Sequence, residues 1–219
     1  MDKYFGILKK CPLFRNVREA DYIKIINCLG GHAVKYQKDQ MILEKGEASR
    51  YICVVLSGSV QVVRDYSNGR RVIISRISPS GIVGEAVAIT ENAYVPVDVI
   101  AETDCEILLI DGIRVMNPCH KNCHFHINLI KNLLDELAIK NIWLTQRIEI
   151  TSRKTTRDKL MAFLNMVAKD HGGNEFTIPF DRQELADFLG VERSAMSAEI
   201  SRLRAEGILE SNRNHFRLL

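Results

Sequence analysis

The segment DRQELADFLGVERSAMSAEISRLRAEGIL at residues 181–209 has the pattern of two helices joined by a tight turn. Asp181 is a favourable N-cap residue, and Glu184 three positions later completes a capping box. Gly190 permits the left-handed backbone that a sharp turn between two helices needs. A second helix is predicted for residues 193–206, and at 3.6-residue spacing its buried stripe is Met196, Ile200 and Leu203. This pattern is typical of a helix-turn-helix, and a plain helical hairpin is the alternative.

The outward face of this second helix carries small or hydrogen-bonding side chains near its start, the end that enters the major groove in helix-turn-helix proteins. The candidates for base contacts are Arg193, Ser194, Ser197, Ala198 and Ser201. Residues 208–218 read as strand, turn and strand, and residues 175–178 supply a third strand, so the segment is predicted to be a winged helix. Arg213 in the turn and Arg182 at the start of the first helix are expected near DNA phosphates, with Gln183 beside them.

The composition limits the number of domains and the classes of protein to which this chain can belong. The chain has 219 residues, of which 46% are hydrophobic and 26% are charged, which suits one large or two modest globular domains. Residues 153–219 hold 11 Lys and Arg against 10 Asp and Glu, so the case for nucleic acid depends on the motif and not on bulk charge. No apolar run approaches the roughly 18 residues of a membrane span. The first residues lack a signal-peptide core, and the six cysteines are too scattered for a disulfide framework, so we expect a cytoplasmic protein with reduced thiols.

Residues 32–115 have a different character, with short β-rich runs separated by turn signals. Asn68-Gly69 between two alternating runs is a strong signal for a tight hairpin. Many short strands at this spacing are typical of a β-sandwich or roll. The predicted strands are residues 41–43, 51–56, 60–65, 71–77, 95–102 and 106–110. Before them, residues 1–30 read as short helices that are broken at Pro12.

From about residue 122 to residue 151 the pattern changes to one long helix. Its seam residues alternate at spacings of three and four, as in the heptads of a coiled coil. The seam consists of Ile127, Ile130, Leu134, Leu137, Asn141, Leu144 and Ile148. At an a position of a parallel homodimer, Asn141 meets its own copy and fixes the register. The alternative is a helix packed on its own domain, which Ile139, Ile142 and Trp143 on other faces also suggest, and both arrangements can hold together.

The order of N-terminal helices, β-roll, long helix, polar hinge at residues 152–156 and winged helix resembles the cyclic-AMP receptor protein and fumarate-nitrate regulator superfamily of bacterial transcription factors. The motifs that carry the resemblance are CPLF at 11–14, LSGSV at 56–60, GIVGE at 81–85, TRDKL at 156–160 and RQELA at 182–186. The resemblance covers nearly the whole chain and implies an α+β fold. Its parts are a double-stranded β-helix of the jelly-roll type at residues 1–121, a dimerisation helix at residues 122–151 and a winged helix-turn-helix domain at residues 152–219.

The resemblance also implies a homodimeric regulator that binds a pseudo-palindromic double-stranded DNA operator and converts an effector signal into altered DNA affinity. RNA polymerase is the further partner that it implies. The best-known members place a Glu and an Arg about four residues apart at the start of the recognition helix, where this chain has Ser194 and Ala198. The operator sequence therefore cannot be borrowed from them, although Arg193 is suited to a bidentate contact with guanine.

The expected effector pocket departs from the cyclic-nucleotide binders of this superfamily. In those proteins a Gly-Glu pair opens a turn that holds the phosphate, and an Arg about ten residues later neutralises it. Gly84, Glu85 and Ala86 are present here, but the fifteen residues after Glu85 contain no Arg or Lys, and Val95-Pro96 stands where the Arg is expected. By spacing, Leu144 and Thr145 of the long helix fall at this pocket. We therefore expect a small-molecule effector other than cyclic AMP, because a buried phosphate would lack a charged partner; a roll kept as a scaffold with no ligand is the alternative.

Two other classes of function have partial support in the sequence. Cys119 and Cys123 form an i,i+4 pair that could share a metal, which favours a metal- or thiol-based redox sensor as the alternative, whereas a solvated helix start is the plainer interpretation. An iron–sulfur cluster is a weaker expectation, because the N-terminus offers Cys11 alone. A cupin-like enzyme would need several histidines within the roll, and residues 32–115 contain only His32, so we expect no enzyme.

Overall fold

The computed structural model describes residues 2–65, 71–117 and 124–219. The chain divides into two compact units, residues 1–139 and residues 140–219. One continuous helix, α5 (His124–Thr151), contributes its first part to one unit and its last part to the other. The dimerisation helix expected at residues 122–151 coincides closely with α5, and its separate role stays a prediction. None of the described helices is long and apolar enough to cross a membrane.

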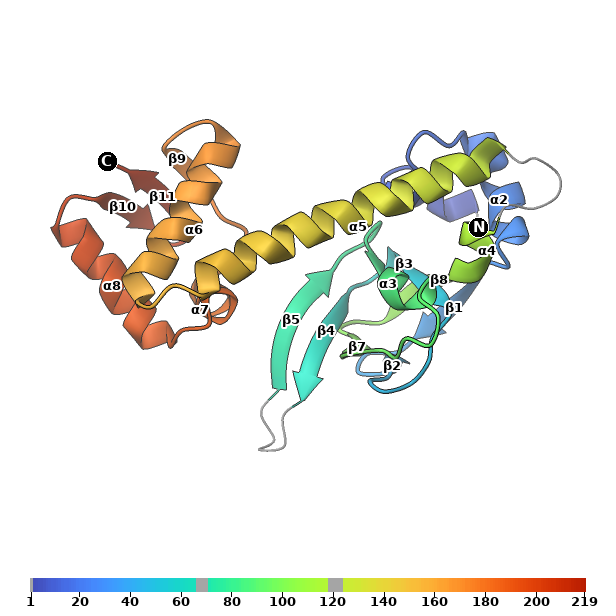
Figure 1. Ribbon diagram of the computed structural model, residues 1–219, viewed down its shortest axis with the longest axis horizontal. Coiled ribbons are helices and arrows are strands. Elements are labelled where there is room, and N and C mark those ends of the chain that lie inside the picture. Colours follow the sequence, from blue (N-terminus) through green and yellow to red (C-terminus); the bar gives the residue numbers. More distant parts are fainter. Residues whose placement is uncertain (1, 66–70, 118–123) are drawn as a thin grey trace. The chain divides into compact units, whose positions relative to one another are not determined.

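The first unit begins with short helical pieces that pack on α5 (Figure 1). They are η1 (Asp2–Tyr4), α1 (Phe5–Leu8), η2 (Pro12–Phe14), η3 (Glu19–Asp21) and α2 (Tyr22–Cys28). Asn132 of α5 is buried, and its side-chain amide donates to the backbone oxygens of Leu13 at 3.0 Å and Arg15 at 2.7 Å. Short helices broken at Pro12 were predicted, and the structure confirms them.

The β-roll consists of two antiparallel four-stranded sheets (Figure 1). The first sheet has the order β1-β8-β3-β6, from β1 (His32–Tyr36), β8 (Cys105–Asp111), β3 (Tyr51–Ser57) and β6 (Ile82–Val83). The second has the order β2-β7-β4-β5, from β2 (Met41–Leu43), β7 (Asp98–Ala101), β4 (Val60–Asp65) and β5 (Arg71–Ile77). Two short helices, α3 (Glu85–Ala88) and α4 (Gly112–Met116), complete the unit. Alternation places one set of side chains in the roll interior and the other against the helices, so β3 is buried on both faces.

The roll confirms the predicted β architecture and corrects some of its strands. β1 and β6 were missed, and the strand predicted at residues 95–102 begins only at Asp98. The correction has a local cause: Pro96 has no N–H to donate to a ladder, and the N–H of Val95 bonds instead to the backbone oxygen of Glu47 at 2.9 Å. The Asn68-Gly69 turn lies outside the described residues.

The second unit is a winged helix-turn-helix, as the sequence predicts. Its helices are α6 (Thr156–His171), α7 (Arg182–Leu189) and α8 (Arg193–Ala205), and its sheet has the order β10-β11-β9, from β10 (Leu209–Asn212), β11 (His215–Leu218) and β9 (Glu175–Thr177). The end of α5 belongs to the same core, because Ile150 is buried there and the Trp143 ring lies 5.7 Å from that of Phe188 on α7. Arg147 of α5 places its guanidinium 5.0 Å from the Phe188 ring centroid.

Candidate nucleic-acid interface

The start of α7 is fixed by the predicted capping box. The Asp181 carboxylate accepts from the backbone N–H groups of Gln183 at 2.7 Å and Glu184 at 2.8 Å, and the Glu184 carboxylate accepts from the backbone N–H of Asp181 at 2.9 Å. Gly190 ends the helix with φ 63°, in the left-handed region expected of it. The turn between α7 and α8 is therefore as short as the sequence predicts, since α7 ends at Leu189 and α8 begins at Arg193.

Helix α8 has the two faces that the periodicity predicts. Met196, Ile200 and Leu203 are buried in the core, whereas Arg193, Ser194, Ala198 and Ser201 are exposed. Ser197 is half-buried, and its backbone oxygen accepts from the Ser201 hydroxyl at 3.1 Å. The N-cap residue Glu192 makes no side-chain capping bond, so the first N–H groups of α8 are available to an acceptor such as a phosphate.

A hollow of about 600 Å³ opens where the two helices meet the wing. Its lining brings Arg182 and Gln183 of α7 together with Arg193 of α8 and Arg213 of the wing turn. Arg213 lies in the short turn between β10 and β11, and its φ of 51° is in the left-handed region. The structure thus gathers four of the residues that were predicted for DNA contact, although they come from three different elements.

Arg182 is less open than the sequence suggests. Its guanidinium lies 5.1 Å from the Phe216 ring centroid, and Nη2 donates to the Ser211 hydroxyl at 3.4 Å. Nη1 is buried, and it has no hydrogen-bond partner in the described part of the chain. Burial lowers the pKa of this guanidinium, and the charge of Arg204 adds to the effect. Arg182 therefore ties α7 to the wing sheet as well as facing the hollow.

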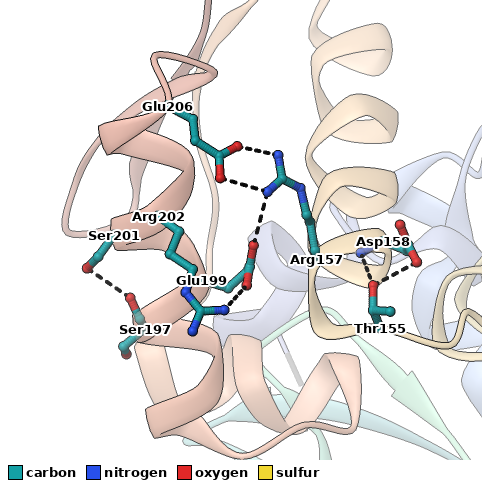
Figure 2. A network of polar contacts seen from close by, with 8 residues as sticks. All are labelled: Thr155, Arg157, Asp158, Ser197, Glu199, Ser201, Arg202 and Glu206. Atoms are coloured by element: carbon teal, nitrogen blue, oxygen red, sulfur yellow. Dashed lines mark hydrogen bonds and ion pairs between the residues drawn. The ribbon is translucent and has the colours of Figure 1, made fainter.

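A set of ion pairs joins the first turn of α6 to α8 (Figure 2). Arg157 makes two contacts to Glu206, Nη1–Oε1 at 3.0 Å and Nη2–Oε2 at 2.5 Å, and it reaches Oε1 of Glu199 at 3.6 Å. Arg202 lies 3.4 Å from the other Glu199 oxygen. The Arg157 hydrogen bond holds the pKa of the Glu206 carboxyl below its usual value. Sequence reasoning missed this set, although a Glu beside the apolar stripe of α8 is a visible signal of a buried carboxylate.

The effector residues of the roll are divided between its surface and its interior. Gly84 has φ 83°, and a Cβ there would lie 2.9 Å from Leu43 Cδ1 and 3.0 Å from the Tyr51 backbone oxygen, so only glycine fits this turn. Glu85 is buried, and Val95 is buried in the apolar interior of the roll. Ala86 and Pro96 are exposed. Leu144 and Thr145 belong to the second unit and are exposed, with the Thr145 hydroxyl donating to the Asn141 backbone oxygen at 2.9 Å.

The candidate metal or redox residues Cys119 and Cys123 lie outside the described residues. Among the described cysteines, Cys11, Cys53 and Cys105 are buried and Cys28 is half-buried. Burial raises the pKa of the Cys53 thiol to about 12, with the charge of Glu85 as a second cause, so this thiol is protonated and unreactive near neutral pH. Across residues 2–65, 71–117 and 124–219, no three His, Cys, Asp or Glu side chains gather in a way that could hold a metal.

The side chains at the a positions of the predicted seam are exposed to solvent along α5. The exposed fractions are 71% for Ile127, 55% for Leu134 and 67% for Ile148, and Leu144 at a d position is 50% exposed. Asn141 is exposed as well. Leu137 packs against the core of the first unit, so one residue of the seam also serves the chain's own fold.

Comparison with known proteins assigns both units. Residues 33–122 match the model of the cyclic nucleotide-binding domain, and residues 158–219 match that of the Crp-like helix-turn-helix domain. The transcriptional activator protein FnrL of Cereibacter sphaeroides is 26% identical over 183 residues, which span 80% of this chain and 71% of FnrL. The structure of FixK2 from Bradyrhizobium japonicum matches with a TM-score of 0.55 at 20% identity, covering 86% of this chain and 92% of FixK2. That of CLP, the c-di-GMP responsive global regulator of Xanthomonas campestris, matches with 0.62 at 19% identity, covering 91% and 98%.

Proposed function

Because this chain belongs to the Crp/Fnr superfamily and is a DNA-binding transcription regulator, we propose that it works as a cytoplasmic homodimer that reads a two-fold related operator and answers to an effector other than cyclic AMP. It has no catalytic activity in this proposal, and RNA polymerase is its further partner at the promoter. The observation that carries the proposal is the exposed apolar seam of α5, which lies in the same chain as a complete winged helix.

The seam supports a dimer on energetic grounds. Ile127, Leu134 and Ile148 are each more than half exposed in one copy, and each large aliphatic side chain contributes roughly 1.5–3 kcal/mol when it is fully buried. A second copy of α5 in parallel would bury all of them against their own counterparts. Two recognition helices would then enter successive major grooves about 34 Å apart, which is one turn of the duplex.

The exposed residues at the start of α8 support base recognition by a few side chains. Arg193 is exposed at the start of the helix and is the one long basic side chain among the predicted base contacts. It is suited to a bidentate contact with guanine, and the serines add weaker hydrogen bonds. Gln183, Arg182 and Arg213 at the hollow beside it supply phosphate contacts that set the register.

The experiment is a selection of random duplex DNA by the purified protein, followed by affinity measurement. The wild type is expected to enrich an inverted repeat. Arg193→Ala should weaken binding to the selected site by about 1–3 kcal/mol and relax one base position in each half-site. Arg18→Ala, which removes an exposed arginine from the other unit, is the control. Failure of the wild type to enrich any repeat would contradict the proposed operator.

Calorimetry with cyclic AMP tests the effector part of the proposal. The fifteen residues after Glu85 contain no Arg or Lys, so binding is expected to be no tighter than about millimolar, near −4 kcal/mol. CLP of Xanthomonas campestris is a c-di-GMP responsive regulator, so this dinucleotide belongs in the same titration. A micromolar dissociation constant for cyclic AMP would contradict the proposal.

A further inference from the structure

The recognition helix α8 is held from the side by the first turn of α6 (Figure 2). Arg157 lies in that turn and bridges two carboxylates of α8, Glu199 near the middle and Glu206 at the C-cap. The Arg157–Glu206 contact uses both terminal nitrogens of the guanidinium and both carboxylate oxygens, so it fixes orientation as well as distance.

The charges of this pair oppose their own helices. Arg157 is a cation in the first turn of α6, where the helix dipole disfavours positive charge, and Glu206 is an anion at the C-cap of α8, where it disfavours negative charge. Each charge is unfavourable alone and favourable with the other. The two helices are thereby held together at one point by a pair that neither helix would favour by itself.

Glu199 makes the link specific. It is only 8% exposed on the buried side of α8, and a buried carboxylate is costly without compensating charge. Arg157 at 3.6 Å and Arg202 at 3.4 Å supply that charge. Two cations and two carboxylates form this cluster, so it carries no net charge.

The cluster lies beside the base-contact face and not on it. Residues 199, 202 and 206 fall on one side of α8 because they are three and seven positions apart, whereas Ser194, Ala198 and Ser201 line another side. Arg157 therefore touches the helix without occupying the face that meets the bases. We propose that Arg157 is a positioning residue for DNA recognition, which sets the angle at which α8 presents Arg193, Ser194 and Ala198 to the groove.

Arg157 is itself fixed next to the turn between α5 and α6. Thr155 caps α6, with its hydroxyl accepting from the Asp158 N–H at 3.1 Å and lying 2.7 Å from Asp158 Oδ2. Arg157 is two residues after this cap, so the link to α8 starts at the N-terminal end of α6. The inference rests on the proposed function, because it concerns how the operator is read.

The test compares Arg157→Ala with Arg157→Lys and with Lys169→Ala, a control that removes a cation from the far end of the same helix. Affinity is measured for the selected operator, for its single-base variants and across a salt series. Arg157→Ala is expected to lose at least tenfold in discrimination between the operator and its variants, with an unchanged salt slope. Arg157→Lys, which keeps one charged contact, should restore part of the discrimination, and Lys169→Ala should match the wild type.

Two results would overturn the inference. One is a wild-type base preference in Arg157→Ala. The other is an equal loss on every sequence with the salt slope reduced by about one, since that marks a phosphate contact. If Arg157→Ala does not fold, Glu206→Gln removes the paired charge and keeps the Glu199 contact, and the same loss of discrimination is expected from it. A wild type that selects no operator overturns the proposed function instead.

Discussion

Among individual residues, the buried polar side chains differ in how well they are satisfied. Asn132 makes two hydrogen bonds to the N-terminal segment, and Asp111 caps α4 while pairing with Arg50 at 3.0 Å. His126 is only 1% exposed, and its Nδ1 has no partner within the described chain. Burial lowers the pKa of His126 below the usual 6.5, and a hydrogen bond with the Arg114 backbone opposes this only in part. The neutral ring is therefore the form that the folded unit accommodates.

This arrangement predicts a loss of stability in mild acid. The unfolded chain binds a proton at His126 more readily than the folded chain, so the free energy of unfolding should fall as the pH drops below about 6.5. Urea unfolding of the first unit at pH 7.5 and 5.5 measures the effect. His126→Leu should flatten this dependence, whereas His171→Leu in the other unit should leave it unchanged. Equal slopes for wild type and His126→Leu would contradict the prediction.

At the level of elements, helices were predicted well where local signals agree. The capping box at Asp181, the turn at Gly190 and the apolar stripe of α8 are all local, and each stands as predicted. The strand β1 was missed because it is largely exposed and carries His32 and Lys35 among its five residues. The strand β6 was missed because it has only two residues, which pair with β3. The Arg157–Glu206 pair joins positions 49 apart, and no sequence periodicity reports such a contact.

The cap of α7 gives a measurable contribution to the stability of the second unit. Asp181→Ala removes the acceptor for two backbone N–H groups and should cost about 0.5–2 kcal/mol. Asp187→Ala on the same helix is the matched control, since it removes the same charge from an exposed position where the carboxylate accepts from the Gln183 side chain. Its effect should stay within about 0.5 kcal/mol. Equal losses in urea unfolding of the two variants would show that the cap contributes nothing particular.

At the scale of the whole molecule, helix α5 contributes buried side chains to both units and also exposes apolar ones. The face of α5 that carries Leu129 and Leu133 is buried in the first unit, and Ile150 is buried in the second. Between them, Leu134, Leu144 and Ile148 are at least half exposed, and Asn141 is an exposed polar side chain where an aliphatic one would give a coiled-coil dimer more stability. A helix built only for its own chain would gain nothing from Ile127, Leu134 and Ile148 at these positions.

Replacement of Asn141 tests whether the seam is a parallel dimer. Asn141→Leu should raise the thermal stability of the dimer and loosen its register or its oligomeric state, because the paired amides no longer favour one alignment. Light scattering and thermal melts measure both effects. Glu149→Leu, at an exposed b position outside the seam, is the control and should change neither. A wild type that is monomeric at micromolar concentration would contradict the seam.

Trp143 is the one tryptophan of the chain, and its indole lies beside Phe188 with the Arg147 guanidinium 5.7 Å from its ring. Indole emission depends on the polarity and the charges around the ring. Because the chain has a single tryptophan, its fluorescence reports on one place alone, the end of α5 that packs against α7 of the winged helix. The protein therefore carries its own optical probe, and no dye has to be attached to follow an effector or an operator acting at that place.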